Sequence, residues 1–245
     1  MFRPENINPE IIETLRTIPT YAVAKRLVIT ELHCFSACKR AGIFEIYTQE
    51  YVDELTAFIT MRFGKQARVV EACAGDGRLT KALQQRGIDV TAVDDRSRSA
   101  RDAWARHHRP HPSESPSSPS HPKGSGIDYP GWVIKADAIE YIKEHEPGLV
   151  IASWIELGDD LDQRLVEIGI PLIIIAEMSL GGTTGTSEFW GRNDLEYERL
   201  KEISYYNLSR ADAGGHMSSL GSSTSTHLVT LKRSSVTKQI GVPFI

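Results

Sequence analysis

The sequence lacks any long apolar run, and this absence excludes a membrane-spanning helix. Its longest apolar runs, Leu172 to Ala176 and Leu149 to Ala152, fall far short of the roughly 18 to 20 residues that a helix needs to cross a bilayer. The first residues, MFRPENINPE, contain no apolar signal core. We therefore expect neither a membrane role nor a secretion role.

Cysteine is scarce as well, with 3 residues in a chain of 245. An odd and small number of thiols cannot form a disulfide framework, which points to a reducing compartment, and we expect a cytoplasmic protein. Cys34 and Cys38 are four residues apart in the stretch Tyr21 to Lys39, which has a helical pattern, and this spacing places two metal ligands on one helix face. No second ligand pair accompanies them, so we interpret them as buried apolar thiols and expect no metal site.

The chain has little net charge of either sign. Its 28 Lys and Arg residues and 32 Asp and Glu residues leave a net charge of −4, which gives no global field that would attract nucleic acid or acidic lipid. One local segment, Arg96 to Lys123, is basic and rich in histidine. It can be read as a phosphate-tracking arm for RNA or phosphorylated substrates, or as a histidine-rich metal tract. The interpretation we favour is a solvated helix face followed by disorder.

What is present indicates an α/β fold. The hydrophobic content of 40% is typical of a folded globular protein. Helical patterns fill the first 65 residues, beginning at Asn8-Pro9-Glu10, at Tyr21 to Lys39 and at Thr48. Apolar runs then alternate with amphipathic segments, and this alternation predicts a doubly wound parallel sheet covered by helices. The expected strands are Ala67–Ala72, Ile88–Val93, Trp132–Lys135, Leu149–Ser153 and Leu172–Glu177, and the expected helices are Leu79–Arg86, Ser97–His107, Ala138–His145 and Leu161–Ile168.

Two regions interrupt this alternation. Residues 110 to 126 contain five Pro and six Ser, a composition that cannot offset its ordering entropy, so we predict a disordered insertion at about 109–127. Near the C-terminus we expect a helix over Asp194–Lys201, an aromatic strand over Ile203–Leu208 and an alternating strand over Thr226–Lys232. Since no helix pattern separates those two strands, we predict that they form an antiparallel pair at the sheet edge.

The segment Glu71-Ala72-Cys73-Ala74-Gly75-Asp76-Gly77 follows a buried strand and leads into a helix. Glycines at such a turn let the backbone pass close to a ligand and point amide groups at it. Asp94 ends the next strand, 17 residues after Gly77, where a carboxylate can accept both hydroxyls of a ribose. A dinucleotide fingerprint would need a third glycine where Thr80 stands, so a different nucleoside cofactor is favoured.

This turn resembles motif I of the class I S-adenosylmethionine-dependent methyltransferases, ExGxGxG, with Cys73 in place of the first glycine. The resemblance extends over Ala67 to roughly Arg233, since Asp94 matches the ribose-binding acid of that family and Ala136-Asp137-Ala138 matches its adenine-contacting segment. It implies a Rossmann-like sheet of seven strands with an antiparallel edge strand at residues 66–245, preceded by a helical N-terminal extension at residues 1–65.

The resemblance also implies roles for individual residues and S-adenosyl-L-methionine as the cofactor. Glu71 would orient the methionine ammonium, Asp94 would hold the ribose, and Asp137 with Ala138 would meet the adenine. The remaining cofactor contacts would come from Cys73, Gly75, Gly77 and Ser153.

The acceptor side carries weaker signals. The [DNS]PP[YFW] segment of the family members that methylate planar nucleobase nitrogens is absent, and Ser153-Trp154-Ile155-Glu156 stands in its place. Trp154 is a candidate stacking wall for the acceptor and Glu156 a candidate general base.

We therefore expect methyl transfer to an oxygen or nitrogen of a small molecule or peptide, with nucleic acid disfavoured by the net charge. An RNA methyltransferase that uses residues 96–123, and a binding or interaction module with a vestigial site, remain open alternatives. The sequence does not indicate an oligomeric state.

Overall fold

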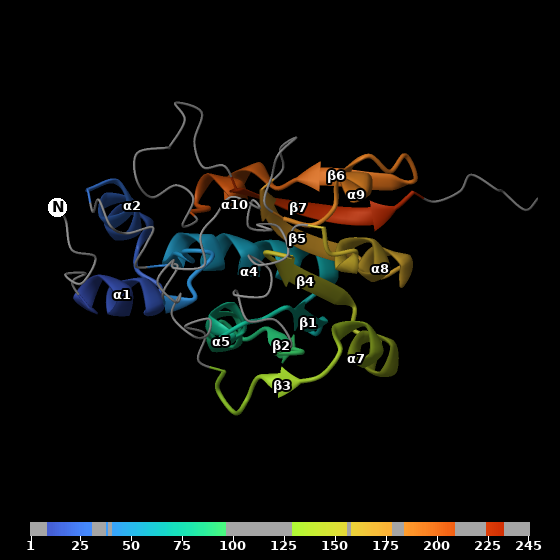
Figure 1. The fold of residues 1–245 in the computed structure, drawn as a ribbon, viewed down its shortest axis with the longest axis horizontal. Coiled ribbons are helices and arrows are strands. Elements are labelled where there is room, and N and C mark those ends of the chain that lie inside the picture. The colour runs from blue at the N-terminus through green and yellow to red at the C-terminus, as the bar shows by residue number, and fades with distance from the viewer. Residues whose placement is uncertain are drawn as a thin grey trace, which may run out of the picture.

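The computed structural model describes residues 9–30, 38, 41–96, 129–155, 158–177, 184–208 and 224–232. One seven-stranded sheet forms its centre, in the order β3-β2-β1-β4-β5-β7-β6 (Figure 1). The strands are β1 (Arg68–Ala72), β2 (Asp89–Asp94), β3 (Ile134–Lys135), β4 (Leu149–Ser153), β5 (Leu172–Glu177), β6 (Leu195–Arg199) and β7 (Thr224–Leu231).

Strands β1 to β6 run in the same direction, and β7 alone runs opposite to them. β1 pairs in parallel with both β2 and β4, whereas β7 is antiparallel to both β5 and β6. A parallel connection needs a helix-length crossover, and the amphipathic segments that alternate with the apolar runs supply it. The predicted doubly wound sheet of seven strands with one antiparallel strand is therefore confirmed. That strand, β7, was expected at the edge and is instead flanked by β6, which forms the edge.

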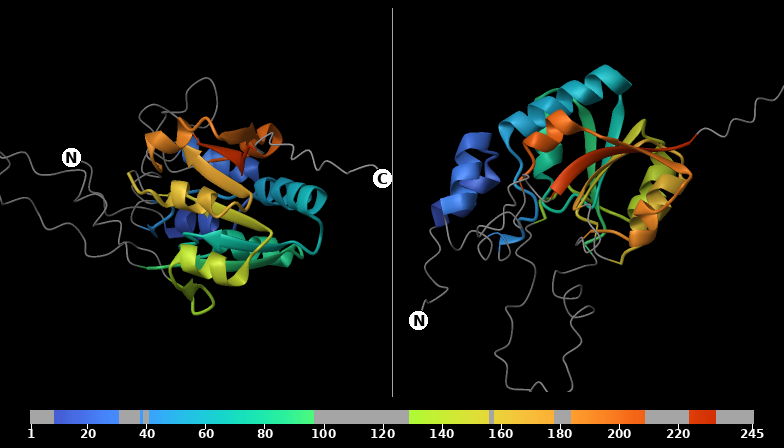
Figure 2. Two further views of the ribbon diagram at one scale, coloured as in Figure 1. Left: turned by 90° about the vertical axis from the view of Figure 1, so that its right-hand side faces the viewer. Right: turned by 90° about the horizontal axis from the view of Figure 1, so that it is seen from above.

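Helices cover both faces of the sheet (Figure 2). The helices α4 (Gln49–Phe63), α5 (Arg78–Gln85) and α10 (Lys201–Tyr205) share one core with Val69 of β1 and Ile151 of β4. The helices α7 (Ala138–His145), α8 (Leu161–Glu167) and α9 (Ser187–Trp190) share the other core with Val70 and Val150. Neighbouring strand residues thus face opposite cores, which is why Val69-Val70 and Leu149 to Ala152 are continuous apolar runs.

The helix α4 begins where the sequence predicts it. Thr48 is its N-cap, and the Thr48 side chain accepts a hydrogen bond from the backbone N–H of Tyr51. Tyr51, Leu55 and Ile59 are buried at a spacing of four residues, so one face of the helix packs on the sheet. The helix ends at Gly64, whose φ of 86° favours glycine and whose N–H bonds to the Thr60 carbonyl.

Two shorter helices precede α4 and form a separate small core. The helices α1 (Pro9–Arg16) and α2 (Tyr21–Thr30) lie next to each other at one side of the sheet (Figure 1). They bury Leu15 and Val28 together with Ile46 and Leu208. The backbone N–H of Ile46 donates to the Leu208 carbonyl at 2.8 Å, which ties this core to the C-terminal part of the chain.

Of the two N-terminal cysteines, Cys38 is buried in the same small core. Cys34 lies outside the described residues. Within the described ranges no group of three or more His, Cys, Asp or Glu side chains is arranged to hold a metal ion.

The C-terminal prediction is wrong in its assignment of two elements. Residues 195–199 form the strand β6 instead of a helix, and residues 201–205 form the helix α10 where an aromatic strand was expected. In β6, Leu195 and Tyr197 face the core while Glu196 and Glu198 are exposed. This alternation has a period of two, and pairing with β7 outweighs the helix propensity of the charged residues.

Several predictions concern residues outside the described ranges, among them the helix at 97–107 and the insertion at about 109–127. Among the described helices, none is long and apolar enough to cross a membrane.

Candidate active site

The turn after β1 is built from left-handed backbone conformations. Cys73, Gly75 and Gly77 have φ angles of 56°, 57° and 69°, and Gly77 is the N-cap of α5. This conformation costs little for glycine but is unfavourable for a side chain such as that of Cys73. The turn thus brings the first backbone amides of α5 to the carboxyl edge of the sheet, as the motif predicts.

The two glycines of the turn face different surroundings. A Cβ atom on Gly75 would meet nothing within 4 Å, so open space lies beside this backbone. A Cβ atom on Gly77 would instead lie 2.5 Å from the Trp132 indole, so the packing of Trp132 requires a glycine there. Gly75 therefore has the surroundings expected of a residue that a ligand approaches, whereas protein packing accounts for Gly77.

Asp94 lies beside this turn, as its place at the end of β2 predicts. One carboxylate oxygen accepts a hydrogen bond from the Gly75 N–H at 3.0 Å, and the other accepts one from the Arg96 N–H at 2.8 Å. Partial burial raises the Asp94 pKa above its ordinary value, and these two hydrogen bonds oppose the shift. The carboxylate and the open side of Gly75 are therefore adjacent.

Glu71 is buried at the end of β1, with an exposed fraction of 1%. Its carboxylate accepts hydrogen bonds from both the backbone N–H and the hydroxyl of Thr80, in the first turn of α5. Burial is the main cause that raises the Glu71 pKa to about 7, and the bonds from Thr80 counteract it. Thr80, which breaks the dinucleotide fingerprint in the sequence, thus has a role of its own as the partner of Glu71.

The segment after β3 also reaches the same edge. The backbone N–H of Ala136 donates to the Asp94 carbonyl at 3.3 Å, which brings the ends of β2 and β3 together. Asp137 is the N-cap of α7, where its side chain accepts from the Glu140 N–H, and Ala138 is buried beside it. Asp137 is therefore engaged in capping, and its predicted contact with adenine stays a prediction.

The end of β4 lies against a segment that the sequence did not single out. Ser153 accepts a hydrogen bond from the Tyr47 hydroxyl at 3.2 Å. The next residue, Trp154, donates its indole N–H to the Glu45 carboxylate at 2.6 Å, and its ring lies 6.1 Å from that of Phe44. Residues 44–47 thus reach the place that the resemblance assigns to methyl transfer.

The only local sequence signal for this segment is an acidic residue inside an apolar stretch, Ile43-Phe44-Glu45-Ile46-Tyr47. Its partners are more than 100 residues away, so no spacing pattern could have identified it. The candidate base Glu156 lies outside the described residues.

Arg78 joins the N-terminal segment to the cofactor turn. Its guanidinium pairs with Asp76 at 2.7 Å and donates to the backbone carbonyls of Leu15 and Glu45. Burial, together with the nearby Glu71 and Glu45 carboxylates, holds the Tyr47 pKa well above its usual range, so the Tyr47 hydroxyl keeps its proton. Hydrogen bonds therefore connect the turn, the end of β4 and the N-terminal segment.

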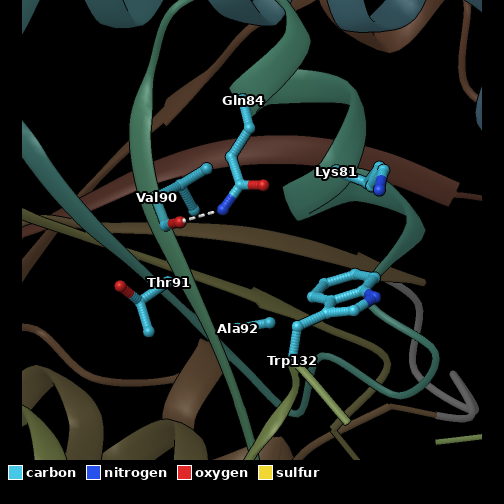
Figure 3. A pocket seen from close by; sticks show the side chains of 6 residues that line it. All are labelled: Lys81, Gln84, Val90, Thr91, Ala92 and Trp132. Atoms are coloured by element: carbon cyan, nitrogen blue, oxygen red, sulfur yellow. Dashed lines mark hydrogen bonds between the residues drawn. The ribbon is translucent and has the colours of Figure 1, made fainter. Parts of the chain in front are cut away.

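A hollow of about 430 Å³ lies between α5 and β2 (Figure 3). Lys81 lies 5.7 Å from the centre of the Trp132 ring, and Gln84 donates to the Val90 carbonyl on its wall. Its remaining lining residues are Thr91 and Ala92. None of these six residues is among those predicted to bind cofactor or acceptor.

Comparison with known proteins gives distant structural matches. No protein-family model matches the chain, and no curated protein matches it either. The 1,6-didemethyltoxoflavin-N1-methyltransferase of Burkholderia thailandensis, solved with S-adenosylhomocysteine, matches at 15% identity and a TM-score of 0.42, over 96% of this chain and 94% of that one. The magnesium protoporphyrin IX methyltransferase of Synechocystis PCC 6803 matches at 13% identity and 0.41, over 76% and 83%.

The sheet itself identifies the fold. The order β3-β2-β1-β4-β5-β7-β6, with β7 antiparallel to both of its neighbours, is the topology of the class I methyltransferases. The helices α1 and α2 precede this core. The chain therefore has the fold of the class I S-adenosylmethionine-dependent methyltransferases.

Proposed function

We propose that this protein is an S-adenosylmethionine-dependent methyltransferase that methylates an oxygen or nitrogen of a small-molecule or peptide acceptor. The observation that carries the proposal is the contact between the Asp94 carboxylate and the Gly75 N–H, beside the open space at Gly75. The hydroxyl groups of a ribose can donate to Asp94 in place of the backbone N–H groups that donate to it now, while the rest of the ligand passes over Gly75.

The residues around the turn fit the parts of this cofactor. Asp94 would accept the ribose hydroxyls, Gly75 and Cys73 would offer backbone to the methionine moiety, and the buried Glu71 would stabilise its ammonium group. The adenine would lie toward Asp137 and Ala138, at the end of β3. Gly77 and Ser153 complete the proposed set, with Gly77 at the start of α5 and Ser153 at the end of β4.

The bound cofactor supplies an activated methyl group, so the protein has to align the acceptor and exclude water. Trp154 and Ser153 form the wall at the end of β4, and the N-terminal segment closes that wall through Glu45 and Tyr47. We place the acceptor against this wall, with Glu156 as the candidate base that removes its proton.

The direct test measures binding of S-adenosylhomocysteine by calorimetry to the wild-type protein and to Asp94→Ala. We expect micromolar binding by the wild type and an affinity about 10 to 150 times lower for the variant, because hydrogen bonds to a charged group contribute about 1.5–3 kcal/mol. Asp89→Ala is the matched control, since Asp89 lies in the same strand but is exposed at its opposite end.

Two outcomes would contradict the proposal. A wild-type protein that does not bind S-adenosylhomocysteine would favour the interaction module with a vestigial site. Equal affinities of Asp94→Ala and Asp89→Ala would remove Asp94 from the ribose site.

A further inference from the structure

Arg78 is a cation beside the proposed cofactor turn, and little of it is exposed. It follows Gly77 at the start of α5, and the exposed fraction of its side chain is 14%. Asp76, two residues earlier, holds it through an ion pair of 2.7 Å between the guanidinium Nε and the carboxylate. Because this partner belongs to the turn itself, the guanidinium is kept next to the backbone that the cofactor would pass.

The other contacts of Arg78 fix its direction without neutralising its charge. Its two terminal nitrogens donate to the backbone carbonyls of Leu15 and Glu45, at 3.3 and 3.5 Å. A guanidinium has five N–H groups in a planar fork, and these two bonds with the bond to Asp76 use three of them. The described contacts therefore leave N–H groups for one more acceptor, and a carboxylate is the acceptor that matches the fork.

Glu71 and Arg78 bring opposite charges to the same turn. The Glu71 carboxylate accepts hydrogen bonds from Thr80, two residues after Arg78 in the first turn of α5. Burial is the main cause that raises the Glu71 pKa, and the bonds from Thr80 and the charge of Arg78 lower it. The two side chains are thus close enough to interact electrostatically.

Such a pair of charges is complementary to an α-amino acid. The methionine moiety of the cofactor carries an ammonium and a carboxylate on one carbon atom, so its head group needs an anion and a cation close together. Glu71 is the proposed partner of the ammonium, and without a cation the carboxylate would be repelled by Glu71 and Asp76. Arg78 offsets this repulsion, whereas Lys81, the next cation of α5, lies over the Trp132 ring.

We propose that Arg78 binds the carboxylate of the methionine moiety, and that Arg78 and Glu71 together make the site specific for cofactors with an α-amino acid head group. This inference rests on the proposed methyltransferase function and adds a specificity-determining residue to the same site. The open space beside Gly75, three residues before Arg78, is where the methionine moiety would pass. Two N–H groups of the guanidinium would donate to the two carboxylate oxygens.

The test compares two ligands that differ only in this carboxylate, S-adenosylhomocysteine and its decarboxylated analogue S-adenosyl-3-thiopropylamine. Calorimetric titrations are made at about pH 8, where Glu71 is mostly ionised. Because a hydrogen bond to a charged group contributes at least about a factor of ten, we expect the wild type to prefer S-adenosylhomocysteine at least about tenfold. Arg78→Met keeps a long side chain but removes the charge and the N–H groups, so it should reduce the preference to less than about threefold.

The ratio of the two affinities separates carboxylate binding from a structural role. Loss of the bonds to the Leu15 and Glu45 carbonyls would weaken both ligands alike and leave the ratio unchanged. Arg86→Met is the matched control and should behave as wild type, because Arg86 lies at the other end of α5 and pairs with Asp53. If Arg78→Met does not fold, Arg78→Gln replaces it, since the amide keeps N–H donors but carries no charge. It should lose most of the preference.

The inference is overturned if the wild type binds both ligands with equal affinity or prefers the decarboxylated one. It is also overturned if Arg78→Met, or Arg78→Gln in its place, keeps the full preference, or if Arg86→Met loses as much of it. Failure of the wild type to bind either ligand would instead count against the proposed function itself.

Discussion

The two sides of the proposed site differ in how far apart their residues lie in the sequence. On the cofactor side, Gly75 and Asp94 are 19 residues apart, and one strand–turn–helix unit with the next strand places them together. On the acceptor side, Glu45 and Trp154 are 109 residues apart, and only the folded chain brings them into contact. The comparison teaches that a local motif can be recognised in one sequence, whereas a site assembled over long distances cannot.

The largest expected effect is the loss of cofactor binding after a substitution on the cofactor side. In Gly75→Val, a β-branched side chain would occupy the open space beside the turn and would be strained at a φ of 57°. We expect S-adenosylhomocysteine affinity to fall more than about 100-fold in calorimetry, since the ligand and the side chain need the same space. Gly87→Val is the control for strain, because Gly87 also has a positive φ, of 84°, with open space around it, and lies in the turn at the other end of α5. If both variants bind normally, ligand does not approach Gly75.

A second, smaller effect depends on the protonation of Glu71. Its pKa is about 7 in the folded protein, so the carboxyl is neutral below that pH and charged above it. An ionised Glu71 attracts the cofactor ammonium, and we therefore expect affinity for S-adenosylhomocysteine to rise about tenfold between pH 5.5 and pH 8.5. The control is Glu71→Gln, which should show a flatter profile over the same range. A flat profile in the wild type would remove Glu71 from the ammonium site.

A third prediction concerns the departure from the family motif. Cys73 has a side chain at a φ of 56°, where glycine is free of strain. Cys73→Gly should therefore leave S-adenosylhomocysteine affinity unchanged and alter the free energy of unfolding by about 1 kcal/mol at most, because relief of backbone strain is offset by the greater entropy of an unfolded glycine. Denaturant unfolding and calorimetry measure the two quantities. A large loss of affinity would mean that the Cys73 side chain itself contacts the cofactor.

A fourth prediction, with an effect of similar size, concerns the acceptor side. Tyr47→Phe removes the hydroxyl that donates to Ser153 and keeps the ring. We expect a loss of about 1 kcal/mol in the free energy of unfolding, the usual contribution of one hydrogen bond, with S-adenosylhomocysteine affinity unchanged. Tyr205→Phe is the control, because Tyr205 is 63% exposed. A drop in cofactor affinity for Tyr47→Phe would show that the acceptor side and the cofactor side of the site are coupled.

Most of the fold was predictable because its elements have strong local signals. The parallel strands β4 and β5 contain the continuous apolar runs Leu149 to Ala152 and Leu172 to Ala176, and Thr48 marks the start of α4 as an N-cap. The exception lies at residues 194–208, where the charged residues of β6 favour a helix in isolation. Pairing with β7 decides that segment, and pairing is a tertiary interaction.

The cofactor side was predictable for the same reason, since a strand followed by a small-residue turn and a helix constrains its own geometry. Two details there still needed the structure. Gly77 is required by the Trp132 ring, which lies 55 residues further along the chain, and Thr80 is the partner of the buried Glu71. Neither contact follows from the spacing within the motif, because each depends on where side chains pack after folding.

The sequence by itself determined the alternating α/β core, the turn from Glu71 to Gly77 and the acid Asp94 at the end of β2. Each of these depends on local backbone preference or on the period of the apolar residues, which a single sequence contains. The tertiary structure alone decided that β6 is a strand and that Glu45 and Tyr47 lie against Ser153 and Trp154. The contacts of Glu45 and Tyr47 close over more than 100 residues, and those of β6 depend on pairing with β7. The buried surface and hydrogen bonds that stabilise both exist only once the sheet has formed.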